Sequence, residues 1–246
     1  MKRPQTISDM SAVVTGMLLG MNLPPTINPL YGVIGSFVAI GIAKQLFGGI
    51  GQNFANPAIV GRIVLMLSFT ASMSTWCKPF YYLNGADVVT GATPLVSKDA
   101  DYLSLLLGTT GGCIGETCAI ALIAGGIYLI AARIITPHAP VAFIGTVFLL
   151  TLIAGDDPIY AVLSGGLIIG AFFMATDYAT TPLTGKGKII FGIGCGLITF
   201  AIRKFGNYPE GVSFSILLMN LLVPYIDRLC ETKPVGAKAP EKEASK

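Results

Sequence analysis

The residues best suited to chemistry lie in one short polar stretch, Asp87 to Leu95. Within it Thr93 supplies a hydroxyl, and Gly91 and Ala92 carry too little side chain to obstruct an approaching enzyme. Pro94 favours an extended backbone at the residue before it, which would present the Thr93 hydroxyl outward. These features suit a site of covalent modification. Because Thr, Gly and Pro are also common in turns, an ordinary turn is the alternative.

Two charged residues accompany long apolar runs. Arg62 lies inside the run 57–76, where an intramembrane charge is costly and is therefore a candidate functional group. Its guanidinium could bind a phosphate or a carboxylate, and a structural tie to loop carbonyls is the alternative. Glu116 stands at the start of a later run, 113–135. There we expect it to interact with the positive end of a helix rather than to carry protons.

A group of polar residues follows another apolar run, 159–175. Its members are Thr176, Asp177, Thr180 and Thr181. Hydroxyl and carboxylate oxygens in such a place could line an ion path, for which Thr176 and Asp177 are the candidates. A cap at the end of a helix is the alternative.

Three other patterns favour structural roles. Cys113 and Cys118 could be an iron–sulfur ligand pair, but cysteine is also a small apolar residue suited to packed helices. The run Asn56–Ala58 resembles one box of a water channel, which needs two. An Asn N-cap followed by Pro at the first helical position explains it without a channel. His138, the single histidine, has no accompanying ligand set, so we expect no metal site.

The composition that surrounds these residues is that of a membrane protein. Of the 246 residues, 53% are hydrophobic and 12% are charged, against about 25% charged in soluble proteins. The net charge of +3 is scattered, so no nucleic-acid partner is expected. The eight apolar segments that we expect to cross a bilayer, some as broken helices, are 11–23, 29–46, 57–76, 113–135, 139–154, 159–175, 189–203 and 212–227.

The positions of Lys and Arg give the expected orientation of these segments. Both chain ends fall in the cytoplasm, and the long connection after the third segment falls on the external face. We therefore divide the chain into a first, truncated membrane repeat (1–76), an external loop (77–112), a second membrane repeat (113–228) and a disordered cytoplasmic tail (229–246).

The two membrane repeats are related by a weak inverted symmetry. Ile42–Gly48 at the end of the second segment resembles Ala201–Gly206 at the end of the seventh. Segments one to three then match segments six to eight in the opposite orientation, as in many transporters. We expect an all-α polytopic fold with an inverted 5+5 repeat whose first two helices are missing from repeat one. A passive channel or a secondary transporter of a small solute is the alternative function for such a fold.

The residues Asp87–Thr93 resemble the recognition sequence, DxxTGAT, of the flavin transferase that joins FMN to threonine through a phosphoester. Further runs that are similar to one family are Ser11–Gly16, Lys44–Gly49, Asn56–Ala58, Phe172–Asp177 and Tyr208–Val212. With these residues the chain resembles the NqrB/RnfD family, which includes the D subunits of Rnf complexes and the related B subunits of sodium-pumping NADH:quinone reductases. Members of this family normally have further helices before the point where this chain begins.

The resemblance implies a membrane subunit of an ion-pumping ferredoxin:NAD oxidoreductase complex. Such a subunit couples electron transfer to translocation of Na⁺ or H⁺ and is not a catalyst on its own. The implied partners are the other Rnf subunits (A, B, C, E and G), the flavin transferase and the lipid bilayer. The implied location is a bacterial or archaeal cell membrane.

The resemblance also implies flavin sites. FMN would be attached to Thr93, and the residues that the transferase would recognise are Asp87, Thr90, Gly91 and Ala92. Arg62 is a candidate for the flavin phosphate, and Lys78 or Lys98 could offset its charge. A second, non-covalent flavin such as riboflavin could bind among the helices, and Thr176 and Asp177 are candidates to contact it.

Overall fold

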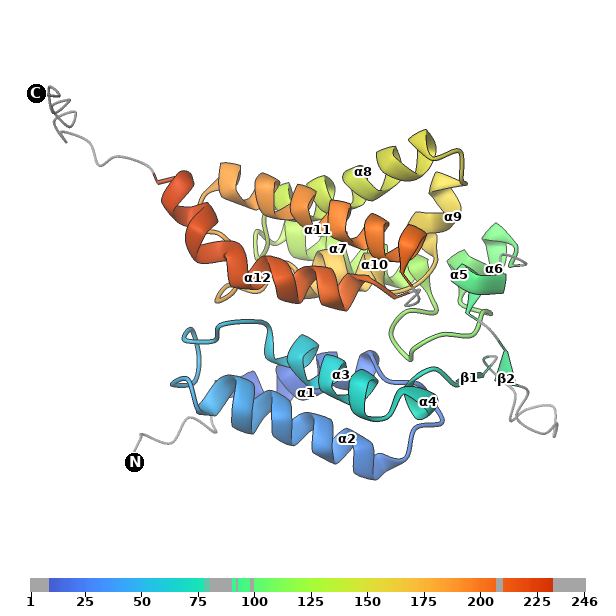
Figure 1. The fold of residues 1–246 in the computed structure, drawn as a ribbon, viewed down its shortest axis with the longest axis horizontal. Coiled ribbons are helices and arrows are strands. Elements are labelled where there is room, and N and C mark those ends of the chain that lie inside the picture. The colour runs from blue at the N-terminus through green and yellow to red at the C-terminus, as the bar shows by residue number, and fades with distance from the viewer. Residues whose placement is uncertain are drawn as a thin grey trace, which may run out of the picture.

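The computed structural model of the chain describes residues 9–77, 79, 90–91, 93–97, 100–206 and 210–231. These residues form a helical protein with one two-stranded antiparallel pairing. Figure 1 shows two layers of helices, one formed by α1 to α4 and the other by α7 to α12. The short helices α5 and α6 and the two strands lie at one end of these layers.

The first layer contains four α-helices and a π-helix. Their bounds are α1 (Ser11–Met21), α2 (Pro29–Ser36), η2 (Phe37–Gln45), α3 (Pro57–Ser68) and α4 (Thr70–Met73). α2 continues directly into η2, and α3 packs against η2, α1 and α2. The side chain of Asn56 accepts a hydrogen bond from the backbone N–H of Ala58 at 3.0 Å, and Pro57 is the first residue of α3. The structure thus confirms the N-cap interpretation of the run Asn56–Ala58.

The connection between the layers holds the short elements. They are β1 (Trp76–Cys77), β2 (Thr90–Gly91), α5 (Pro94–Ser97) and α6 (Tyr102–Leu107). In the strand pairing Trp76 lies opposite Gly91, and Cys77 lies opposite Thr90. The pairing therefore joins the end of the first layer to the residues that precede Thr93.

The second layer contains the longest helices. Its elements are α7 (Ala119–Ala131), α8 (His138–Ile153), α9 (Pro158–Leu163), α10 (Leu167–Ile169), η4 (Gly170–Met174), α11 (Gly185–Phe205) and α12 (Val212–Leu229). α8 and α11 pack closely along each other. A Cβ atom on Gly192 of α11 would stand 2.6 Å from the carbonyl oxygen of Ala139, so glycine is required for this approach.

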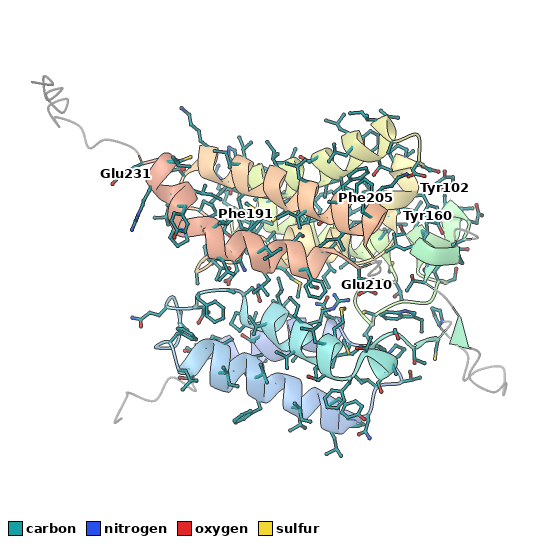
Figure 2. The ribbon with its side chains drawn as sticks, viewed as in Figure 1. Tyr102, Tyr160, Phe191, Phe205, Glu210 and Glu231 are labelled. Carbon is teal, nitrogen blue, oxygen red and sulfur yellow. The ribbon has the colours of Figure 1, made fainter. Side chains whose placement is uncertain are left out.

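Buried apolar side chains fill the second layer and its contact with the first. Phe143 of α8 and Phe191 of α11 are fully buried, and Figure 2 shows Phe191 in the second layer. The two layers meet where α3 packs against α12, and Ile59 and Ile216 from these helices belong to one buried cluster. Arg62 of α3 and Glu210, which directly precedes α12, form an ion pair at this same contact.

Helices occur within each of the eight apolar segments expected from the sequence. Within the expected segment 159–175, a turn at Ser164–Gly166 separates α9 from α10, a break that the sequence did not predict. Gly165 in this turn has φ +69°, a conformation that strongly favours glycine. In the described part of the chain, α11 and α12 are long and apolar enough to cross a membrane by length and composition. The count of eight spans and the inverted repeat stay predictions.

Candidate functional site

Thr93 lies directly before α5 and is buried, with 4% of its surface exposed. The expectation of an outward-facing hydroxyl was therefore wrong. Its Oγ1 atom has no hydrogen-bond partner among the described residues. Buried hydroxyls normally have a partner, and an orphaned one suits a position where the oxygen is bonded to another group. The unpaired hydroxyl is compatible with attachment, but its burial requires the segment to move away from α9 before a group can be joined to it.

Two contacts hold the segment that follows Thr93. The Tyr160 hydroxyl of α9 donates to the carbonyl oxygen of Pro94 at 2.8 Å. Leu95 packs closely on the turn at Gly165. A Cβ atom added to Gly165 would stand 2.6 Å from the Cδ1 atom of Leu95. The break between α9 and α10, which the sequence did not predict, therefore forms part of the surface against which the segment after Thr93 packs. Figure 2 shows Tyr160 at the end of the bundle that also carries Tyr102 of α6.

The other predicted residues of this stretch are only partly described. Thr90 and Gly91 form β2, and the structure places their backbone opposite β1. Asp87 and Ala92 lie outside the described residues, as do Lys78 and Lys98. Their predicted roles in transferase recognition and in charge compensation stay predictions.

A hollow of about 310 Å³ opens beside the Thr93 segment, between α8, α9 and α11. Its lining includes Leu95, Val147, Tyr160, Phe200, Arg203 and Lys204. Arg203 donates to the carbonyl oxygens of Ala161 at 2.6 Å and Ser164 at 3.3 Å. Lys204 forms an ion pair with Asp156 at 2.6 Å. The hollow thus combines aromatic walls with a rim of mixed charge, where Asp156 and Asp157 line it together with Arg203 and Lys204.

Arg62 lies in a second polar site, where α3 meets the second layer. Its guanidinium is buried and pairs with two carboxylates, that of Glu116 at 3.3 Å and that of Glu210. It also donates to the side-chain oxygen of Asn22 and to the sulfur of Cys113, the latter at 3.4 Å. The sequence left phosphate, carboxylate and loop carbonyl groups open as partners of Arg62. In the structure its charged partners are carboxylates. Figure 2 shows Glu210 between the two layers.

This site corrects the interpretation of Glu116. Its carboxylate binds Arg62, whereas α7 begins only at Ala119 with Cys118 as N-cap, so Glu116 is not a partner of the helix N-terminus. The Cys113 sulfur and carboxylate oxygens of Glu116 and Glu210 lie within 4.8 Å of one another, a spacing that could hold a cation. The Arg62 guanidinium already supplies a positive charge to these groups.

Sequence analysis missed Asn22 and gave Glu210 no chemical role. Both lie at breaks between apolar segments, Asn22 after α1 and Glu210 before α12. A buried arginine needs counter-charges and acceptors, because an unpaired charge in an apolar interior is costly. Searching the breaks for carboxylates that could meet Arg62 would have found Glu210.

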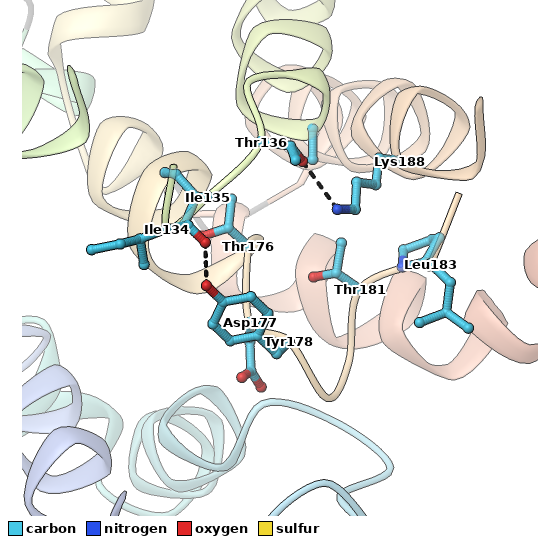
Figure 3. Close-up of a pocket in the computed structure, with 11 residues that line it drawn as sticks. Ile134, Ile135, Thr136, Thr176, Asp177, Tyr178, Thr181, Leu183 and Lys188 are labelled. Atoms are coloured by element: carbon cyan, nitrogen blue, oxygen red, sulfur yellow. Dashed lines mark hydrogen bonds between the residues drawn. The ribbon is translucent and has the colours of Figure 1, made fainter. Parts of the chain in front are cut away.

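Thr176 and Asp177 lie on the connection after η4 (Figure 3). The Thr176 hydroxyl donates to the carbonyl oxygen of Phe172 at 2.6 Å, and the Thr180 hydroxyl donates to Asp177 at 3.1 Å. Burial raises the pKa of the Asp177 carboxyl above its usual value. Both residues also line a cavity of about 740 Å³ between the two layers, together with Lys44, Phe172 and Phe173.

The Thr93 and Asp177 sites lie at opposite ends of the bundle. Lys188, near the start of α11, lines a pocket with Asp177, whereas Arg203, near its end, lines the hollow beside Thr93. At 1.5 Å of helix rise per residue, these positions on α11 are separated by about 22 Å. The two polar sites are therefore distinct, and the orientation of the chain in the membrane stays a prediction.

Comparison with known proteins yields one family. The model of the NQR2, RnfD, RnfE family matches residues 1–236. In Acetobacterium woodii, the D subunit of the Na⁺-translocating ferredoxin:NAD⁺ oxidoreductase complex is 47% identical, over 99% of this chain and 78% of the relative. The D subunit of the proton-translocating complex of Clostridium ljungdahlii is 48% identical, over 96% and 77%. That of an ion-translocating oxidoreductase complex of Stutzerimonas stutzeri is 39% identical, over 94% and 77%.

Proposed function

The chain belongs to the NQR2, RnfD, RnfE family, and from this membership we propose that it is the D subunit of a membrane-bound, ion-translocating ferredoxin:NAD⁺ oxidoreductase complex. Relatives that bear this name are 47% and 48% identical to it. The subunit works with the other subunits of the complex (A, B, C, E and G) and does not catalyse the reaction alone. Because the two relatives are named for different ions, the proposal extends to either Na⁺ or H⁺.

The proposed electron carrier is FMN, joined to Thr93 through a phosphoester. The observation that carries this proposal is the orphaned, buried Oγ1 atom of Thr93 at the end of the TGAT sequence. FMN supplies the redox chemistry, and the protein sets its position, its potential and its access to water. Because Thr93 is buried, the transferase must reach it before the segment packs against α9, or when the segment swings away.

A second, non-covalent flavin such as riboflavin is proposed for the cavity of about 740 Å³ between the layers. This volume lies within the range of about 300–1,000 Å³ that small-molecule sites occupy. Phe172 and Phe173 offer aromatic surfaces, and Thr176, Asp177 and Lys44 offer polar atoms for the edges of a flavin ring. Chromatography of the flavins released from acid-denatured protein would detect riboflavin in amounts equal to the chain, and its absence would remove this second site.

The test of the Thr93 proposal is flavin fluorescence on a denaturing gel. The protein is expressed with its complex in cells that contain the transferase, and Thr93→Ala is compared with Ser97→Ala, an exposed hydroxyl of the same segment. We expect a fluorescent band in the wild type and in Ser97→Ala, and a dark band in Thr93→Ala. A dark wild-type band, or a bright Thr93→Ala band, would contradict attachment at Thr93.

A further inference from the structure

The hollow of about 310 Å³ is continuous with the segment that holds Thr93. Leu95, two residues after Thr93, forms part of its wall. Tyr160 forms another part, and the hydroxyl of the same side chain holds the carbonyl of Pro94 at 2.8 Å. A group attached to Thr93 therefore finds this hollow beside its own attachment segment.

The lining has the chemistry of a site for a flat aromatic ring with one polar edge. Tyr160 and Phe200 contribute aromatic faces, and Val147 contributes an aliphatic wall. Arg203 and Lys204 stand at the rim as cations, and Asp156 and Asp157 line the same hollow. Asp156 pairs with Lys204, and Asp157 accepts hydrogen bonds from the start of α9, so Arg203 is the cation of the lining without an ion pair among the described residues. The volume reaches the lower end of the range of small-molecule sites, about 300 Å³, as suits one ring system rather than a whole dinucleotide.

Arg203 is distinguished from the other cations of the two sites by its partners. Arg62 pairs with Glu210, and Lys204 pairs with Asp156. Arg203 instead binds two backbone carbonyls, and its buried Nε atom has no partner among the described residues. Within the described residues no carboxylate lies at ion-pair distance from it, and Glu116 and Glu210 attract it only from farther away. A cation held in this way suits a partner that carries or gains negative charge.

We propose that this hollow receives the isoalloxazine ring of the flavin on Thr93, and that the Arg203 guanidinium faces the pyrimidine edge of the ring. The inference rests on the proposed attachment at Thr93. Reduction of a flavin by two electrons with uptake of one proton leaves one negative charge on that edge. A fixed cation beside it stabilises the reduced form relative to the oxidised form, and so raises the midpoint potential. Arg203 is thus a positioning and potential-setting residue for the flavin.

The test compares Arg203→Gln with Arg228→Gln in the purified complex. Arg228 is an exposed arginine in the last turn of α12 that does not line this hollow, so it is the matched control. In-gel fluorescence first establishes that each variant carries the covalent flavin. A reductive titration with dithionite and reference dyes, followed through flavin absorbance, then gives the midpoint potential. For Arg203→Gln we expect the reduced form to lose at least tenfold in relative stability, a shift of about −30 mV for two electrons, and Arg203→Lys should restore part of it.

A second variant covers the case in which Arg203→Gln does not assemble. Phe200→Leu removes one aromatic face and leaves the charges in place, and we expect it to change the absorption spectrum of the flavin in the folded protein but not after denaturation. A fully loaded Arg203→Gln with wild-type potential, or a fully loaded Phe200→Leu with a wild-type spectrum, would overturn the proposed ring site. A wild-type protein without covalent flavin would instead overturn attachment at Thr93, so the two failures are distinguishable.

Discussion

Arg62 of α3 forms an ion pair with Glu210, which stands 148 positions later in the chain, directly before α12. A second polar tie joins the same two helices. The side-chain amide of Asn220 satisfies its neighbours when its oxygen faces Asn56. In that orientation the Asn220 oxygen accepts a hydrogen bond from the Asn56 backbone N–H at 3.0 Å. α3 and α12 therefore run past each other in opposite directions, with one tie near each end of their contact. These ties fix the first layer to the second.

The stability of this contact should depend more on Arg62 than on either carboxylate. Arg62→Met leaves Glu116 and Glu210 buried without a counter-charge at close range, and we expect the free energy of unfolding to fall by about 3–5 kcal/mol. Glu210→Gln keeps a hydrogen bond to the guanidinium, and Glu116 remains as its counter-charge, so a loss of about 1–2 kcal/mol is expected. Thermal unfolding in detergent measures both variants. Equal losses would show that the site does not act as a charge-paired unit.

A triple variant separates lost charge pairing from lost packing. Arg62→Met combined with Glu116→Gln and Glu210→Gln removes all three charges, so the cost of uncompensated burial disappears. We expect this variant to be more stable than Arg62→Met alone. A triple variant that is less stable than Arg62→Met would mean that hydrogen bonds, rather than charge balance, dominate the site.

The close packing of α8 and α11 gives a matched pair of glycine substitutions. In Gly192→Ala the new methyl group would stand 2.6 Å from the Ala139 carbonyl oxygen, so the helices must separate, and we expect a loss of about 1–3 kcal/mol. In Gly145→Ala the methyl group meets nothing within 4 Å, and the helix gains up to about 1 kcal/mol from lower backbone entropy. Thermal unfolding midpoints should therefore move in opposite directions, and a shift of the same sign in both would contradict the packing.

The two Asn-Pro helix starts should differ in importance. Asn28 caps α2 on an exposed surface, whereas Asn56 caps α3 and also donates to the carbonyl oxygen of Met174 at 3.2 Å. Asn28→Ala should cost about 1 kcal/mol, as typical caps do. Asn56→Ala should cost about 2–3 kcal/mol, because it also leaves buried groups unpaired. Chemical denaturation of the two variants makes the comparison, and a larger loss for Asn28→Ala would contradict it.

The sequence located the helices because apolar runs and Asn-Pro starts are local features. It did not predict the break at Gly165, since a glycine in an apolar run is compatible with a continuous membrane helix. The partners of Arg62 could not be paired from sequence alone, because Glu210 is brought to it only by the contact of α3 with α12. Burial of Thr93 was likewise missed, since the contacts of the following residues come from α9 and the turn at Gly165.

The pKa values of two aspartates predict pH dependences of opposite sign. The first is Asp157, the exposed N-cap of α9, whose pKa is lowered by hydrogen bonds from the Tyr102 hydroxyl and from the Tyr160 backbone. A carboxyl with a lowered pKa in the folded protein contributes stability above its unfolded pKa, and this contribution is lost as pH falls through the folded value. The advantage of wild type over Asp157→Asn should therefore shrink as pH falls below the unfolded pKa of about 4.

Asp177 should behave in the opposite way. Burial raises its pKa, outweighing the hydrogen bond from Thr180 and the attraction of Lys44, which act in the other direction. Its contribution to stability is fully present below the unfolded pKa of about 4 and is lost as pH rises through the folded value. Asp177→Asn cannot ionise and escapes this loss. The unfolding midpoint of Asp177→Asn minus that of wild type should hence increase from about pH 4 toward neutrality, and a difference that stays constant or decreases would mean that the carboxyl is not desolvated beside the cavity.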